Sequence, residues 1–391
     1  MKIAYICDVL GEANNGTVIA TINFIDHLRK SGHEVYVVSP DKSRIGEKDH
    51  YYVKSVNFGK FLNGVLAKNG VTLAKPDKPL LREVIGKADL VYLQIPFALS
   101  TAAVKIAREL GKPIVSSFHC QAENFTAHFF MMNSRLANHL TYRVFYKNVF
   151  RHCAAIHYPT EFIKSVFYKH TNCEVPAYVI SNGVNPKFFE PLKEEVKKND
   201  KFTIVCSGRY SDEKAQQTLL RAVGRSGNRD KIRVVLAGDG PNRKKYERLA
   251  KKLGVDCEFG FHPQDELIRI LKTADLYVHT ATVEIEAIAC TEAIAAGLVA
   301  LICNSEKSAT KGFAADAWVK FRKYDYKALA HKIDFLIEHP NVLEFYKEKY
   351  KEAGSVLPLD VCMNKMEAML GEVMMRQPQE LPEGEPVCVA E

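Results

Sequence analysis

The chain has 391 residues, 47% hydrophobic and 26% charged, which is long enough for two domains and ordinary for a folded core. No run of about 18 apolar residues occurs, which excludes a membrane-spanning helix. The formal net charge is +8, and the ten cysteines lack the CxxC spacing of a zinc site. Because Cys7, Cys206, Cys290 and Cys303 lie in apolar segments, we expect small buried thiols in a reducing cytosol.

Strands and helices alternate in the first half of the chain. The start predicts a strand rather than a signal peptide. Helical spacing of apolar residues predicts helices at 18–30 and 98–110. Apolar segments predict strands at 3–7, 34–38, 88–95, 113–118 and 154–158. This alternation implies a mostly parallel sheet.

A domain boundary is expected at 184–199, where two prolines and a charged run interrupt the pattern. A second alternating unit begins at Phe202 and continues to about Phe321, and helices follow between Tyr324 and Gly371. The end of the chain, 377–391, has three prolines and four glutamates without periodicity, which predicts a disordered tail.

Two glutamates in the second unit, Glu284 and Glu292, are separated by seven residues and follow an apolar strand. Ligands of open α/β sheets bind at the carboxyl ends of the strands, so both carboxylates are expected to face that edge. A carboxylate can accept two hydrogen bonds from a vicinal diol, which favours a sugar or ribose ligand. The alternative is a solvated helix start, where acids complement the macrodipole.

Two cations occupy a comparable position earlier in the same unit. Arg209 and Lys214 are five residues apart, around a turn that begins at Gly208 after an apolar strand. Such a turn can direct both cations and helix N-terminal amides at one phosphate group. Gly238 lies in a second glycine-rich turn that ends the next strand.

This ordered set resembles the retaining glycosyltransferases of family 4, and the resemblance extends from Lys2 to about Gly371. It implies the α/β GT-B fold, in which two Rossmann-like doubly wound domains face each other across a cleft. The implied parts are an acceptor- and membrane-facing domain at 1–185, a nucleotide-sugar-binding domain at 186–358, and a helix at 359–376 that crosses back. The tail at 377–391 follows this helix.

The resemblance also assigns roles to residues. Arg209 and Lys214 match positions that bind the diphosphate, Glu284 a position that contacts the donor sugar, and Glu292 one that binds the ribose. The usual Phe-Gly after the first glutamate is replaced by Glu286-Ala287, so either Glu284 or Glu286 could touch the sugar. The predicted donor-binding residues are Gly16, Gly208, Arg209, Lys214, Gly238, Glu284, Glu286, Ala287, Ile288 and Glu292.

His119 follows a predicted strand, at a position where the family has a histidine that reaches the reaction centre. The predicted catalytic set is His119, Arg209, Lys214 and Glu284. No matched residue is an obvious nucleophile, so the resemblance implies a front-face displacement that retains configuration. The cations would stabilise the departing nucleoside diphosphate, and no metal or cofactor is expected. Gly16 would present helix-start amides to an anion, or belong to a plain helix cap.

A basic and aromatic stretch between Asn124 and His170 has Glu161 as its only acid. Such segments are expected on anionic membranes, although solvated faces of core helices look alike. Nucleic-acid binding would need a recognition motif, and none is present. The predicted acceptor and membrane residues are Glu123, Asn124, Phe129, Phe130, Arg135, Arg143 and Lys147.

The phrase Gln121 to Asn124 looks like that of bacterial enzymes that glycosylate membrane lipids, and the segment 305–311 resembles a part of bacterial glycolipid synthases or is a surface loop. We therefore expect a cytoplasmic enzyme, peripheral on the inner face of the cell membrane. It would move glucose or galactose from UDP to a hydroxyl of diacylglycerol or ceramide. The alternatives are transfer to a soluble or polyprenyl-linked saccharide, and non-catalytic binding of a sugar nucleotide.

Overall fold

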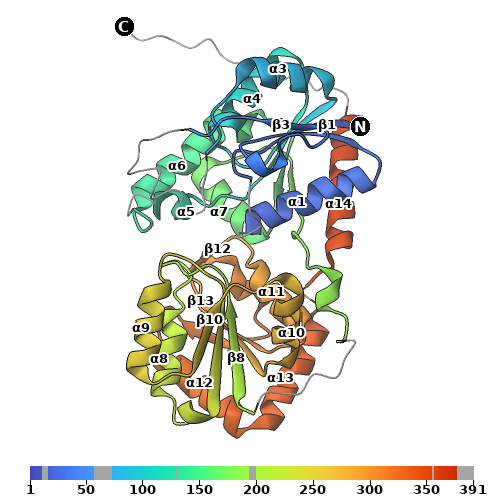
Figure 1. The fold of residues 1–391 in the computed structure, drawn as a ribbon. Helices are drawn as coiled ribbons and strands as arrows, with labels where there is room; N and C mark the ends of the chain where they lie inside the picture. Colours follow the sequence, from blue (N-terminus) through green and yellow to red (C-terminus); the bar gives the residue numbers. More distant parts are fainter. Residues whose placement is uncertain (11–15, 57–72, 128–130, 193–199, 355, 377–391) are drawn as a thin grey trace.

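The computed structural model describes residues 1–10, 16–56, 73–127, 131–192, 200–354 and 356–376. It contains two α/β units, one above the other in Figure 1, each built on a parallel sheet. This arrangement confirms the α/β fold class with two doubly wound units. The tail at 377–391 and the predicted membrane residues Phe129 and Phe130 lie outside the described residues.

The N-terminal unit has a sheet of order β3-β2-β1-β4-β5-β6-β7, in which all neighbouring strands pair in parallel. Its strands are β1 (Lys2–Ile6), β2 (Glu34–Ser39), β3 (His50–Tyr52), β4 (Leu90–Leu93), β5 (Ile114–Ser117), β6 (Ala155–Tyr158) and β7 (Ala177–Val179). Its α-helices are α1 (Gly16–Lys30), α3 (Lys78–Lys87), α4 (Ala98–Glu109), α5 (Ala122–Ala127), α6 (Arg135–Asn148) and α7 (Glu161–Thr171).

The C-terminal unit repeats the plan with the order β10-β9-β8-β11-β13-β15, and a small separate sheet pairs β12 with β14. Its strands are β8 (Phe202–Ser207), β9 (Ile232–Ala237), β10 (Cys257–Gly260), β11 (Leu276–His279), β12 (Val283–Glu284), β13 (Ala300–Asn304), β14 (Lys307–Ser308) and β15 (Lys320–Arg322). Its helices are α8 (Gln217–Arg225), α9 (Arg243–Leu253), α10 (Gln264–Thr273), α11 (Ile288–Ala295), α12 (Tyr326–Glu338) and α13 (Pro340–Ala353).

Short 3-10 turns connect several of these elements, at Lys42–Arg44, Phe150–His152, Pro186–Phe188, Arg229–Lys231 and Ala309–Phe313. None of the helices in the described ranges is both long and apolar enough to cross a membrane.

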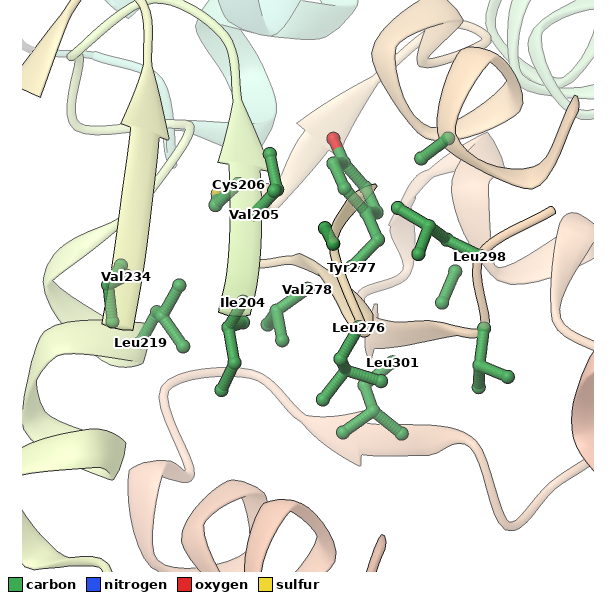
Figure 2. Close-up of a cluster of buried hydrophobic side chains, with 14 of the residues drawn as sticks. Ile204, Val205, Cys206, Leu219, Val234, Leu276, Tyr277, Val278, Leu298 and Leu301 are labelled. Carbon is green, nitrogen blue, oxygen red and sulfur yellow. The ribbon is translucent and has the colours of Figure 1, made fainter. Parts of the chain in front are cut away.

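The core of the C-terminal unit lies around its central strands, where Ile204, Val234 and Leu276 are fully buried (Figure 2). Helices cover both faces of a parallel sheet, so its strands are near-continuous apolar runs, which is why the sequence predicted them well. Cys206, Cys290 and Cys303 are buried and free, as expected.

The last helix, α14 (Leu359–Met375), runs beside the N-terminal unit, close to β1 and α1 (Figure 1). Its buried side chains recur at helical spacing and join the cluster that contains Ile3 and Tyr5. They are Cys362, Met363, Met366, Met369, Leu370 and Val373. Burial of each large apolar side chain contributes about 1.5–3 kcal/mol, so this helix fastens the end of the chain to the N-terminal unit.

The chain passes between the units twice, near Val184 and again near Leu357, and these two crossing segments lie side by side. Val184 and Leu357 are joined by a backbone hydrogen bond of 3.0 Å, and the Leu359 amide donates to the Val184 carbonyl at 2.8 Å. Gly183 has a φ of 74°, and a Cβ there would lie 2.6 Å from the Leu359 Cα. Glycine is therefore required where the crossings meet.

Candidate active site

The candidate site begins where β8 and β9 end, at two glycine-containing turns packed against each other. The Gly208 amide donates to the Ala237 carbonyl at 2.9 Å, and the Tyr210 amide donates to the Asp239 carbonyl at 2.9 Å. A Cβ at Gly238 would collide with the Gly208 carbonyl oxygen, and φ at Gly238 is 156°. Gly238 thus permits close turn packing that holds Gly208 and its neighbour Arg209 in place.

The turn that carries Arg209 and Lys214 is anchored through its backbone. The Gln216 side-chain amide donates to the Arg209 carbonyl at 2.8 Å, and the Thr280 hydroxyl donates to the Lys214 carbonyl at 2.7 Å. Both cations are half-buried. Burial lowers the pKa of Arg209, but a guanidinium stays protonated in proteins. The structure therefore fixes two positive charges at the carboxyl end of the sheet.

Lys214 forms an ion pair with Glu284 across the turn that follows β11. His279 Nε2 lies 3.4 Å from the same carboxylate oxygen. Burial alone would raise the pKa of Glu284, but the charge of Lys214 and the neighbouring His279 together outweigh burial and lower this pKa to about 2. Burial likewise opposes the Lys214 charge, yet Glu284 raises the pKa of Lys214. Both groups are charged at neutral pH, and sequence reasoning did not predict that they pair directly.

Glu286 points away from this pair and binds the interdomain crossing. Its carboxylate accepts hydrogen bonds from the Ser181 hydroxyl, from the Asn182 side-chain amide and, at 3.0 Å, from the Asn182 backbone amide. Burial raises the pKa of Glu286 to about 7. Of the two glutamates left open by the sequence, Glu286 binds the crossing and Glu284 pairs with Lys214.

Ala287 and Ile288 begin α11 directly after Glu286. Ala287 has φ 71° and ψ 60°, a left-handed conformation that costs a non-glycine residue roughly 1–2 kcal/mol. A Cβ built at Gly16, the first residue of α1, would lie 3.6 Å from Ile288 Cδ1. The starts of α1 and α11, from different units, therefore meet at the site.

Glu292 lies on α11 and is only partly exposed. Its carboxylate makes no hydrogen bond or ion pair with any part of the chain that the structure describes. Burial raises the pKa of Glu292 to about 8. A carboxyl group that is largely shielded from water and has no partner among the described residues suits a ligand that brings hydroxyl donors.

His119 enters from the N-terminal unit, directly after β5. Its imidazole packs edge-on against His157, with ring centroids 5.8 Å apart, and forms no hydrogen bond within the described ranges. Burial and the neighbouring His157 lower the pKa of His119 to about 3, so it is neutral at physiological pH. His157 is fixed by the Ser117 hydroxyl at 2.9 Å and the Ile180 carbonyl at 2.7 Å. The imidazole of His119, which has no hydrogen-bond partner within the described ranges, is therefore available to a ligand.

Two family models match most of the chain: Glycosyltransferase Family 4 matches residues 14–188, and Glycosyl transferases group 1 matches residues 188–354. This chain belongs to glycosyltransferase family 4. It is a hexosyltransferase.

Relatives of this glycosyltransferase are named for different sugars, glucose and mannose. It is 23% identical to an alpha-monoglucosyldiacylglycerol synthase of Streptococcus pneumoniae, over 76% of this chain and 70% of that protein. It is 24% identical to a GDP-mannose-dependent alpha-mannosyltransferase of Corynebacterium glutamicum, over 76% of this chain and 71% of that protein. The comparisons thus fix the enzyme class more firmly than the substrates.

A solved structure that covers nearly the whole glycosyltransferase confirms its GT-B fold. HepE of Anabaena in complex with UDP-glucose has a TM-score of 0.72 at 16% identity, covering 95% of this chain and 100% of that chain. The catalytic domain of cholesterol-alpha-glucosyltransferase from Helicobacter pylori is 45% identical and covers 39% of this chain and 97% of that chain, with a TM-score of 0.37.

On the N-terminal side of the glycosyltransferase, Glu123 is buried in α5 and accepts a hydrogen bond of 2.9 Å from the Tyr142 hydroxyl of α6. The neighbouring amide oxygens Gln121 Oε1 and Asn124 Oδ1 are buried, and neither has a hydrogen-bond partner in the part of the chain that the structure describes. Gln121 was not among the predicted site residues, although it lies in the phrase singled out in the sequence. The structure brings these polar groups together just after His119.

Helix α6 places the predicted basic residues Arg135, Arg143 and Lys147 on its exposed side. Next to them runs an exposed apolar row, Leu136, Leu140 and Val144, with 69%, 54% and 52% of their surface accessible. Its opposite side is buried through Asn138, Tyr142 and Phe145. Apolar side chains thus occur on the exposed as well as the buried side of this helix, and core packing does not require the exposed ones.

Proposed function

We propose that this enzyme transfers a hexose, glucose or galactose, from UDP to a hydroxyl of a membrane lipid with retention of configuration. The exposed row of three apolar residues on α6, bordered by basic side chains, is the observation that carries the lipid acceptor. The glucosyldiacylglycerol synthase among the relatives supports a lipid as the acceptor. The UDP-glucose complex of the Anabaena protein supports a UDP-sugar as the donor.

In this proposal the C-terminal domain, 186–358, holds the donor. Arg209 and Lys214 bind the diphosphate, which Gly208 and Gly238 approach through their backbones, and Glu284 contacts the hexose. Glu292, whose carboxyl group has no partner among the described residues, accepts hydrogen bonds from the ribose hydroxyls. Ala287, Ile288 and Gly16 contribute backbone amides from two helix starts.

Transfer then proceeds on one face of the sugar. The acceptor oxygen forms a bond to the anomeric carbon while the bond from that carbon to the UDP oxygen breaks. The hydroxyl proton passes to an oxygen of the leaving diphosphate. Arg209 and Lys214 stabilise the charge that develops there, which a divalent ion could otherwise do. Neutral His119 hydrogen-bonds the hexose near the reaction centre.

The N-terminal domain, 1–185, presents the acceptor. Glu123 and Asn124 line its pocket, and α6 lies on the inner face of the cell membrane with Leu136, Leu140 and Val144 in the lipid. Arg135, Arg143 and Lys147 face anionic headgroups, each contributing about 1 kcal/mol near such a surface.

The test is transfer of label into lipid. Purified protein is incubated with labelled UDP-glucose, UDP-galactose or GDP-mannose and with dispersed diacylglycerol, ceramide or cholesterol, and the organic phase is analysed by mass. Hexosyl lipid formed from a UDP-sugar supports the proposal. Label on an added water-soluble or polyprenyl-linked saccharide would instead establish the alternative acceptor, and use of GDP-mannose alone would overturn the donor.

A further inference from the structure

Lys307 joins the two domains on the side where α5 and α6 lie. Its ammonium donates hydrogen bonds to the Met132 carbonyl at 3.0 Å and to Asn133 Oδ1 at 3.3 Å. Its own carbonyl accepts a hydrogen bond of 3.2 Å from the Gln121 side chain. One residue of the C-terminal domain is therefore held by two segments of the N-terminal domain.

The same residue is paired with the strand that carries the donor glutamate. In the small sheet of β12 and β14, Lys307 is opposite Val283, and Ser308 is opposite Glu284. The Ser305 hydroxyl also donates to the Thr282 carbonyl at 2.6 Å. A displacement of Lys307 would therefore be carried to Glu284 through backbone pairing.

On its other side Lys307 is connected to α6. The Met132 carbonyl that it binds also accepts from the Asn138 side-chain amide at 3.0 Å. Asn138 is buried on α6, and its Oδ1 accepts a hydrogen bond of 2.6 Å from the Thr126 hydroxyl of α5. The Met132 carbonyl thus accepts hydrogen bonds from both Lys307 and Asn138, and it links the C-terminal domain to α6 of the N-terminal domain.

The contact lies beside two buried oxygens that have no hydrogen-bond partner among the described residues. Gln121 Oε1 is one of them, although the nitrogen of the same amide donates to the Lys307 carbonyl. Asn124 Oδ1, three residues further along the chain, is the other. Buried acceptors of this kind favour a ligand that donates, such as a hydroxyl group.

We propose that Lys307 is a positioning residue for transfer: it fixes the strand of Glu284 against segments 121–127 and 131–133, which hold the acceptor hydroxyl. The proposal rests on the proposed function for the identity of the acceptor, whereas the contact itself is independent of it. Lys307 is not proposed to contact the departing diphosphate or the reacting carbon, and its role is to position the groups that do.

The contact is tested by hydrogen–deuterium exchange without any substrate. Lys307→Met should raise amide exchange in peptides covering 131–134 and 305–308 by about tenfold, the order expected when hydrogen bonds to a charged group are lost. Lys327→Met is the matched control, because Lys327 is an exposed lysine of the same domain whose side chain makes no hydrogen bond or ion pair with the described residues. Unchanged exchange in Lys307→Met would overturn the proposal.

Transfer provides the second readout. Lys307→Met should keep UDP affinity within about twofold and lower transfer to lipid by about tenfold or more, with Lys307→Arg recovering part of it because a guanidinium can donate to the same carbonyl. Parallel losses of UDP affinity and transfer would indicate a general structural effect and overturn the positioning role. If the wild type transfers no label to lipid, the proposed function fails, while the exchange result still decides whether Lys307 holds the domains.

Discussion

The ion pair between Lys214 and Glu284 is expected to matter for stability as well as for transfer. The side chains are 25% and 11% exposed, so neither charge is well solvated without the other. The pKa of Glu284 falls from 4.5 to about 2. At 1.36 kcal/mol per unit, this shift corresponds to about 3 kcal/mol of stabilisation of the ionised carboxylate.

Lys214→Met should therefore destabilise the protein by about 3 kcal/mol or more at pH 7, because the burial that opposes the charge of Glu284 remains when its cation is removed. A lowered carboxyl pKa stabilises the folded state above pH 4.5, and this contribution is lost as the pH falls towards 2. The difference between variant and wild type should thus shrink below pH 4.5. Thermal unfolding midpoints measured across this range provide the assay.

A double variant, Lys214→Met with Glu284→Gln, separates stability from catalysis. Removing both charges should restore most of the thermal stability, because no unpaired charge remains. Turnover should stay about 100-fold or more below the wild type in both variants, since a charge that stabilises the leaving group is missing. The reasoning is refuted if the single variant unfolds like the wild type, or if its turnover is unchanged.

Three further predictions concern other parts of the enzyme. Glu292→Ala should weaken UDP binding in calorimetry, whereas unchanged affinity with lower turnover would contradict a ribose contact. Glu286 has a raised pKa, so its contribution to stability is present below pH 4.5 and is lost as the pH rises through about 7. The unfolding free energy of Glu286→Gln should therefore rise by up to about 3 kcal/mol relative to that of the wild type over this pH range. Melting temperatures of the two proteins that change with pH in parallel would contradict this prediction. Arg143→Glu with Lys147→Glu should reduce sedimentation with anionic vesicles at low salt but not with neutral ones, and equal binding to both would exclude an electrostatic role.

The sequence predicted the central strands because buried parallel strands are continuous apolar runs. It did not predict the two edge strands of the N-terminal sheet, β3 (His50–Tyr52) and β7 (Ala177–Val179), whose residues are only partly buried or exposed. The ends were less accurate: the strand expected at 88–95 is limited to Leu90–Leu93. The residues that flank this strand, Ala88 and Asp89 on one side and Gln94 and Ile95 on the other, are an apolar and a polar residue each. Their composition therefore gives no signal for where strand pairing stops.

The candidate site was predictable only where residues lie close together in the chain. Arg209 and Lys214 stand on one turn, and Glu284 and Glu292 flank one helix start, so local spacing indicated both groups. The engagement of Glu286 by Asn182 joins positions 104 residues apart. Such contacts depend on how the domains meet, and no local pattern of apolar or charged residues encodes them.

The central claim is retaining transfer of a hexose to lipid, and the anomeric configuration of the product tests it most directly. The enzyme would be incubated with UDP-glucose or UDP-galactose and lipid in anionic vesicles, and the extracted glycolipid examined by proton NMR. We predict an α-linked hexosyl lipid. A β-linked product would contradict front-face displacement, and label confined to the aqueous phase would contradict the lipid acceptor.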